Sequence, residues 1–122
     1  MSQNNLLDRT KKFAIDCWNF CFKIPKSREY NAFVNQLIRS SSSVGANYRA
    51  SQRAKSTADF INKLKITEEE IDESIYWLEI FEAISSDNTS EIKTLKKEGK
   101  ELLAIIVASI NTSRKNMKKK SF

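Results

Sequence analysis

The sequence contains no histidine, and this absence restricts the chemistry that the chain can perform. Histidine is the side chain that titrates nearest neutral pH, and serine and cysteine hydrolases depend on it as a general base. A Gly-rich phosphate-binding loop is lacking as well. We therefore expect no catalytic residue and no cofactor, and an enzyme is the least favoured class of function.

Cysteine is nearly absent, with Cys17 and Cys21 as its two occurrences. Their spacing of four residues places both side chains on one face of a predicted helix. Without a third cysteine or a histidine, the pair cannot complete a zinc site. We interpret both as small residues of a helix core in a reducing cytoplasm, and we expect no metal.

Proline, glycine and long hydrophobic runs are also scarce. The chain has one proline and two glycines, whereas Lys, Glu, Leu, Ile and Ala are abundant, which is typical of an all-helical (all-α) protein. The apolar run 102–108 is too short to cross a bilayer, and residues 1–13 lack the apolar stretch of a signal peptide. We expect one cytoplasmic domain over residues 1–122 with no membrane contact.

Apolar residues recur every three or four positions in four segments, which predicts four helices. The predicted segments are residues 6–23, 28–55, 57–84 and 91–113. Pro25 ends the first helix, and Ser27 is a candidate N-cap of the second. Ser56 and Asp59 form the capping-box pattern that starts the third. The turn-forming sequence SSDNTS precedes the fourth.

Charge is distributed in blocks along the chain. Residues 1–56 carry ten Lys or Arg against three Asp or Glu, residues 57–91 carry two against ten, and residues 92–122 carry nine against two. This pattern serves antiparallel packing, contacts between subunits, or a separate basic surface for phosphate. The basic tail 114–122 is poor in apolar residues, and we expect it to be disordered.

Residues 36–65 connect two amphipathic helices through small, polar and positively charged side chains. At about 100° per residue, one helix face carries the core positions Tyr30, Phe33, Leu37, Ser41, Val44 and Tyr48. The opposite face carries Arg39, Ser42, Ala46, Arg49, Ala50 and Arg53. Gly45 costs about 1 kcal/mol of helix propensity relative to alanine, which indicates a close approach of another backbone. The arginines on this face can bind phosphate groups, and its small residues allow another helix to pack closely. We predict that Arg49 and Arg53 face solvent.

The third predicted helix has two apolar stripes. The core stripe consists of Phe60, Leu64, Thr67, Ile71, Ser74, Leu78 and Phe81. The second stripe, on roughly the opposite side, consists of Ile66, Trp77, Ile80 and Ile84. A tryptophan among three isoleucines favours a subunit interface over scattered surface hydrophobes. We interpret the acids within residues 68–73 as solvated or ion-paired rather than as a metal site.

Residues 40–80 contain the motifs SSSVGANYR, DFINKL and YWLEI. This stretch resembles the proteins encoded in intervening sequences of bacterial 23S ribosomal RNA genes, a family related to the accessory variability determinant of diversity-generating retroelements. The resemblance extends more loosely to residues 101–113. It implies an antiparallel up-down four-helix bundle that assembles into a ring-shaped homopentamer. For the retroelement relatives it further implies binding to nucleic acid and to a partner reverse transcriptase.

Our leading functional hypothesis is a noncatalytic oligomer that binds RNA or DNA with little sequence specificity, because no base-reading motif is present. The residues assigned to phosphate contacts are Arg39, Arg49, Arg53, Lys55 and Lys63. The alternative is a protein-interaction scaffold or an accessory subunit, in which the arginines pair with acids of the third helix across a subunit interface. Salt-dependent binding of nucleic acid distinguishes the two hypotheses.

Overall fold

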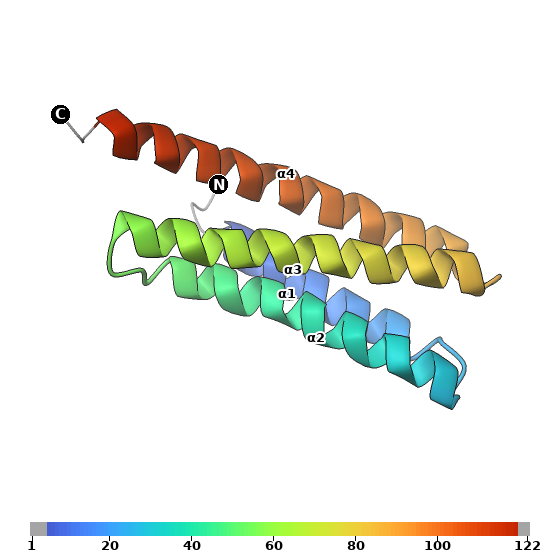
Figure 1. Cartoon of the computed structure of the whole chain (residues 1–122). Coiled ribbons are helices and arrows are strands. Elements are labelled where there is room, and N and C mark those ends of the chain that lie inside the picture. The colour runs from blue at the N-terminus through green and yellow to red at the C-terminus, as the bar shows by residue number, and fades with distance from the viewer. Residues whose placement is uncertain (1–4, 120–122) are drawn as a thin grey trace.

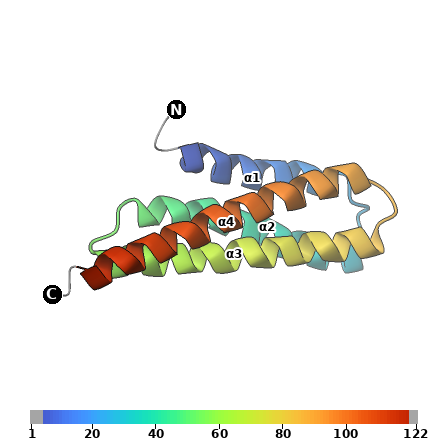
Figure 2. The ribbon, with the colours of Figure 1, turned by 90° about the horizontal axis from the view of Figure 1, so that it is seen from above.

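The computed structural model describes residues 5–119, which form four helices and no strand. The helices are α1 (Asn5–Cys21), α2 (Arg28–Ser51), α3 (Thr57–Ile84) and α4 (Thr89–Lys119), and they lie side by side in an elongated bundle (Figure 1). Each helix packs on two neighbours in the cyclic order α1, α2, α3, α4, with the smallest contact between α1 and α4. The α1–α2 and α3–α4 loops lie at one end of the bundle and the α2–α3 loop at the other (Figure 2). The predicted all-helical bundle of four helices is confirmed.

Serine side chains cap two of the helices as the sequence predicts. Ser27 Oγ accepts a hydrogen bond from the Tyr30 amide at 3.1 Å, and Ser56 Oγ accepts one from the Asp59 amide at 3.1 Å. The Asp59 carboxylate accepts from the amide of Lys55, one residue before the N-cap, so the capping box is shifted by one position. Both serines adopt the extended backbone that an N-cap requires.

Three predicted helix ends are wrong. Helix α1 ends at Cys21 rather than Lys23, because the amides of residues 22–24 bond to carbonyls three residues earlier as the chain turns toward Pro25. Helix α2 ends at Ser51 rather than Lys55. The amides of residues 52–54 bond to the carbonyls three residues earlier, which tightens the chain into a turn before the extended Ser56. Helix α4 continues to Lys119, so the disorder predicted for the basic tail is wrong for residues 114–119. No glycine or proline interrupts this segment, and its lysines lie where the helix dipole favours cations. Residues 120–122 of the predicted tail lie outside the described residues.

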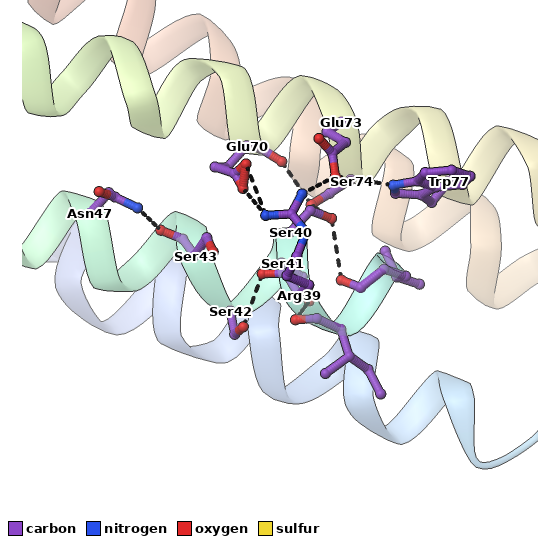
Figure 3. Close-up of polar contacts among 12 residues, drawn as sticks. Arg39, Ser40, Ser41, Ser42, Ser43, Asn47, Glu70, Glu73, Ser74 and Trp77 are labelled. Atoms are coloured by element: carbon purple, nitrogen blue, oxygen red, sulfur yellow. Dashed lines mark hydrogen bonds and ion pairs between the residues drawn. The ribbon is translucent and has the colours of Figure 1, made fainter. Parts of the chain in front are cut away.

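The core runs along the whole bundle and draws on every helix. Its largest fully buried apolar side chains are Phe13, Phe20, Leu37, Leu64, Ile71, Leu78, Phe81, Ile92, Leu102 and Ile106. The predicted core stripe of α3 is confirmed, with Phe60 only half-buried at its start. Ser40 and Ser74 are also buried and share a hydrogen bond of 2.9 Å between their hydroxyl oxygens across α2 and α3 (Figure 3). Within residues 5–119, no helix is long and apolar enough to cross a membrane.

Gly45 marks a close approach of α1 to α2. A Cβ atom added at Gly45 would lie 3.4 Å from the Thr10 carbonyl carbon and hydroxyl oxygen, and 3.5 Å from the Lys11 amide nitrogen. The backbone approach that Gly45 predicts is therefore made by α1 of the same chain. Gly99 in α4 is tighter, since a Cβ there would lie 3.0 Å from Cγ1 of Ile75.

These distances predict opposite results for small and large replacements of Gly45. Gly45→Ala adds a methyl group at ordinary contact distance and should raise the free energy of unfolding by about 0.5–1 kcal/mol through helix propensity. Gly45→Leu should lower it by about 1–3 kcal/mol, because the longer side chain must push α1 away. Urea unfolding followed by circular dichroism, at one fixed protein concentration, measures both changes.

Ala46→Gly is the matched control, because it reverses the propensity change at the neighbouring exposed position. It should destabilise by about the amount that Gly45→Ala stabilises. A clear loss of stability in Gly45→Ala would mean that α1 lies closer to α2 than described.

Candidate nucleic-acid interface

Ion pairs connect three of the four helix–helix interfaces. They are Arg9–Glu98 between α1 and α4 at 2.6 Å, Lys96–Glu82 between α3 and α4 at 2.8 Å, and Arg39–Glu70 between α2 and α3 at 3.0 Å. Across residues 5–119, no ion pair joins α1 to α2. Both of these helices come from the basic block 1–56, so their interface has few acids to neutralise its cations.

Arg39 faces α3, where two carboxylates hold its guanidinium. Its Nη1 donates to Glu70 at 3.0 Å, and its Nη2 bonds Glu73, whose carboxylate also accepts from the Trp77 indole at 3.3 Å (Figure 3). The hydrogen bonds to Glu70 and Glu73 raise the pKa of Arg39 above its ordinary value. The scaffold hypothesis places arginine–acid pairs between subunits. Arg39 instead forms such pairs with α3 of its own chain.

Arg49, in the last turn of α2, and Arg53, in the turn that follows α2, lie on the side that faces α1. Both are exposed, as predicted, and they line a surface groove between α1 and α2 together with Lys11. We call it the α1/α2 groove; its lining residues are Leu7, Asp8, Lys11, Ala14, Ser42, Gly45, Ala46, Arg49, Gln52 and Arg53. In the described part of the chain, none of the three cations forms an ion pair. The groove is thus lined by three cations that form no ion pair with a described residue and by small side chains from both helices.

Lys11 is absent from the sequence-based prediction, although one signal pointed to it. Gly45 indicated a close approach of another backbone, and the backbone that approaches contains Lys11. The sequence did not show which helix would come close, so the third cation of the groove could not be named. The close contact at Gly45 is therefore what adds Lys11 to the predicted Arg49 and Arg53.

The two predicted lysines lie outside the α1/α2 groove. Lys55 lines a hollow at the end of the bundle with Ser56 and with Ser113 of α4, and Lys63 lies half-buried on α3. Neither side chain forms an ion pair with another described residue. The five cations predicted as one surface are thus distributed over four places in the structure.

The second apolar stripe of α3 lies beside the core rather than opposite it. Trp77 is half-buried and stacks at a tilt on Phe33 of α2, with ring centroids 5.6 Å apart. Ile80 is also half-buried, whereas Ile66 and Ile84 are exposed. The position predicted for this stripe is wrong, because α2 already covers part of it. A role in a subunit interface stays a prediction.

A different apolar surface, not singled out in the sequence, is exposed at the C-terminal end of α1 and in the turn after it. Trp18 is 50% exposed and Phe22 is 62% exposed, and their rings meet edge to face with centroids 4.4 Å apart. Ile15, one turn earlier, is exposed as well. The repeat of Ile15, Trp18 and Phe22 at spacings of three and four residues carried this signal, but the stronger core repeat of Phe13, Cys17 and Phe20 obscured it.

The comparison with protein families decides the identity of the chain. A family model of the 23S rRNA-intervening sequence proteins matches residues 2–108. The chain belongs to this family. The predicted membership in the intervening-sequence family is therefore confirmed over most of the sequence.

A solved structure supports the same assignment for this intervening-sequence protein. The crystal structure of a protein of unknown function from the S23 ribosomal protein family of Bacteroides thetaiotaomicron is 29% identical, with a TM-score of 0.79. The similarity covers 85% of this chain and 96% of that chain. A search of curated proteins finds no match. The comparisons thus give a family and a fold, and they leave its biochemical activity open.

Both cysteines of this intervening-sequence protein lie on the inner side of α1. Cys17 is buried and Cys21 is partly buried, and both are free thiols. Burial raises the pKa of Cys17, and it raises the pKa of Cys21 to about 11. Among the described residues, no group of three or more His, Cys, Asp or Glu side chains could hold a metal ion. The cysteines behave as core residues.

The raised pKa values predict slow alkylation of the native protein. At pH 8, a thiol of pKa about 11 is ionised to roughly one part in a thousand, whereas the unfolded chain, with thiols near pKa 8.5, reacts readily. Iodoacetamide labelling followed by mass spectrometry should modify Cys21 faster as the pH rises toward 11, and Cys17 only in urea. Rapid labelling of Cys17 in the native protein at pH 8 would contradict this packing of α1.

Proposed function

We propose that this intervening-sequence protein is a noncatalytic, homo-oligomeric protein that binds RNA or DNA through the α1/α2 groove. The observation that carries the proposal is the convergence of Lys11, Arg49 and Arg53 on one groove with no ion pair among the described residues. At the other helix–helix interfaces, cations pair with acids. Unpaired cations arranged along a groove suit the phosphates of a nucleic-acid backbone.

The proposed assembly is a ring-shaped homopentamer of antiparallel up-down bundles. The exposed Ile66 and Ile84 of α3 are candidates for the subunit contact, together with the outer parts of Trp77 and Ile80. In a ring the α1/α2 groove recurs in every subunit, so individually weak phosphate contacts add through multivalency. Binding is expected to depend steeply on salt and little on sequence, because no base-reading motif is present.

Removing the groove arginines tests the proposal. We expect Arg49→Ala and Arg53→Ala to weaken binding to both RNA and DNA. Each should reduce the slope of log affinity against log salt by about 1 for every groove that the oligonucleotide occupies. Fluorescence anisotropy with labelled oligonucleotides between 50 and 200 mM salt measures affinity and slope together.

Arg39→Ala is the matched control, since it removes an arginine of the same helix that α3 already neutralises. It should leave the salt slope near that of the unmodified protein. The proposal fails if no nucleic acid binds even at low salt. It also fails if Arg39→Ala weakens binding as much as Arg49→Ala does.

A protein-interaction scaffold, for example an accessory subunit of a reverse transcriptase, is the second candidate. The observation that favours it is the outer face of α3, where Tyr76 is exposed among the acids Glu69, Asp72 and Glu79. This acidic face with an aromatic centre complements the charge of the α1/α2 groove. In a scaffold, the groove of one subunit would hold this face of the next.

Charge reversal at Arg49 separates the two candidates. If nucleic acid occupies the groove, Arg49→Glu should leave the oligomer intact and abolish RNA binding at moderate salt, because the new carboxylate repels phosphate. If α3 of another subunit occupies it, the same change should dissociate the oligomer into smaller species. Light scattering on the purified variant, together with anisotropy, distinguishes these outcomes.

A further inference from the structure

The exposed aromatic pair of α1 lies on the same face of the helix as Lys11. Lys11, Ile15 and Trp18 lie within about 60° of one another around the axis of α1, and Phe22, the first residue after α1, packs on Trp18. Along the axis, Trp18 lies about 10 Å from Lys11, at 1.5 Å per residue. Phe22 follows at the end of α1. The aromatic pair therefore continues the line of the α1/α2 groove beyond its Ala14 and Ser42 end, on the side away from Arg49 and Arg53.

The geometry of the pair leaves aromatic surface available. Trp18 and Phe22 meet at an interplanar angle of 89°, so the ring that presents its edge has neither face occupied by its partner. Both side chains are at least half exposed, and no other described ring stacks on them. Exposure of two adjacent aromatic rings to water is unfavourable, and a contiguous exposed apolar patch is typical of a binding surface.

Charge indicates what covers this surface. Lys11, Arg49 and Arg53 line the α1/α2 groove against one acid, Asp8. Ala14, Ser42, Gly45 and Ala46 are small, so a chain in the groove can lie close to both helix backbones. A polyanion that also carries flat apolar rings matches both parts of the surface: its phosphates match the cations and its rings match Trp18 and Phe22.

We infer that the α1/α2 groove and the Trp18–Phe22 pair together bind single-stranded nucleic acid, with an unstacked base lying against the aromatic pair. Bases of an intact duplex are stacked inside the helix and present no face to a side chain, so a duplex can use the cations alone. The inference rests on the proposed function and adds the class of nucleic acid and the residues that select it. Stacking tolerates any base, in agreement with weak sequence specificity.

Trp18→Ala tests the inference. Loss of one base–aromatic stack should weaken binding of a single-stranded 20-nucleotide oligo-U or oligo-dT by about 5- to 100-fold. The salt slope should stay unchanged, because Trp18 neutralises no phosphate. Affinity for a duplex of the same length should also stay unchanged. Trp18→Phe should keep most of the affinity, since a ring remains.

Two further variants serve as controls in the full-length oligomer. Tyr76→Ala removes an aromatic side chain that is 53% exposed on α3 and should leave single-strand affinity unaltered. Trp77→Phe leaves Trp18 as the sole tryptophan, so its fluorescence should be quenched by oligo-dT and not by the duplex. Circular dichroism verifies that each variant folds, which the surface position of Trp18 favours.

The outcomes separate this inference from the proposed function. Absence of binding to both single strands and duplexes overturns the proposed function and the inference with it. Equal affinity for single strands and duplexes, unaffected by Trp18→Ala, leaves the proposed function standing and overturns the inference. Dissociation of the oligomer by Trp18→Ala, with single-strand affinity per subunit unchanged, assigns the aromatic pair to a second copy of the chain and also overturns the inference.

Discussion

The close approach of α1 to α2 at Gly45 is the contact on which the candidate site depends. With the Thr10 backbone 3.4 Å from the position of a Cβ atom at Gly45, the two helices are near enough for Lys11 to line the same groove as Arg49 and Arg53. The small side chains between these cations keep the groove open to solvent. A bulkier residue at position 45 would move α1, and with it Lys11, away from Arg49 and Arg53.

The order of charged blocks along the chain explains why this groove keeps its positive charge. Helix α3 carries most of the acidic block 57–91 and packs between α2 and α4, so its acids neutralise Arg39 on one side and Lys96 on the other. Arg9 and Lys23 pair with Glu98 and Glu91 of α4, so the cations on this side of the bundle are neutralised as well. The α1/α2 interface joins two basic segments. Its cations therefore face solvent, and an external polyanion is the partner that their charge favours.

The sequence predicted what local rules determine and missed what depends on the rotation of one helix against another. Ser27 and Ser56 cap their helices through contacts within four residues, and these predictions are confirmed. Arg39 and Arg49 were placed on one face, although ten residues at about 100° each leave them about 80° apart. In the bundle, this angle is enough to direct Arg39 to α3 and Arg49 to α1. The length of α4 was also missed, because a lysine-rich composition is compatible both with a disordered tail and with the last turns of a helix.

The central claim is that nucleic acid lies against α1 and α2, and photochemical crosslinking locates it most directly. The measurement is ultraviolet crosslinking of the full-length protein to single-stranded RNA, followed by identification of the crosslinked peptides by mass spectrometry. The account predicts crosslinks within residues 7–22, on α1 and at its end, and within residues 42–53, on α2 and in the turn that follows it. Crosslinks confined to α3 or α4 would contradict it.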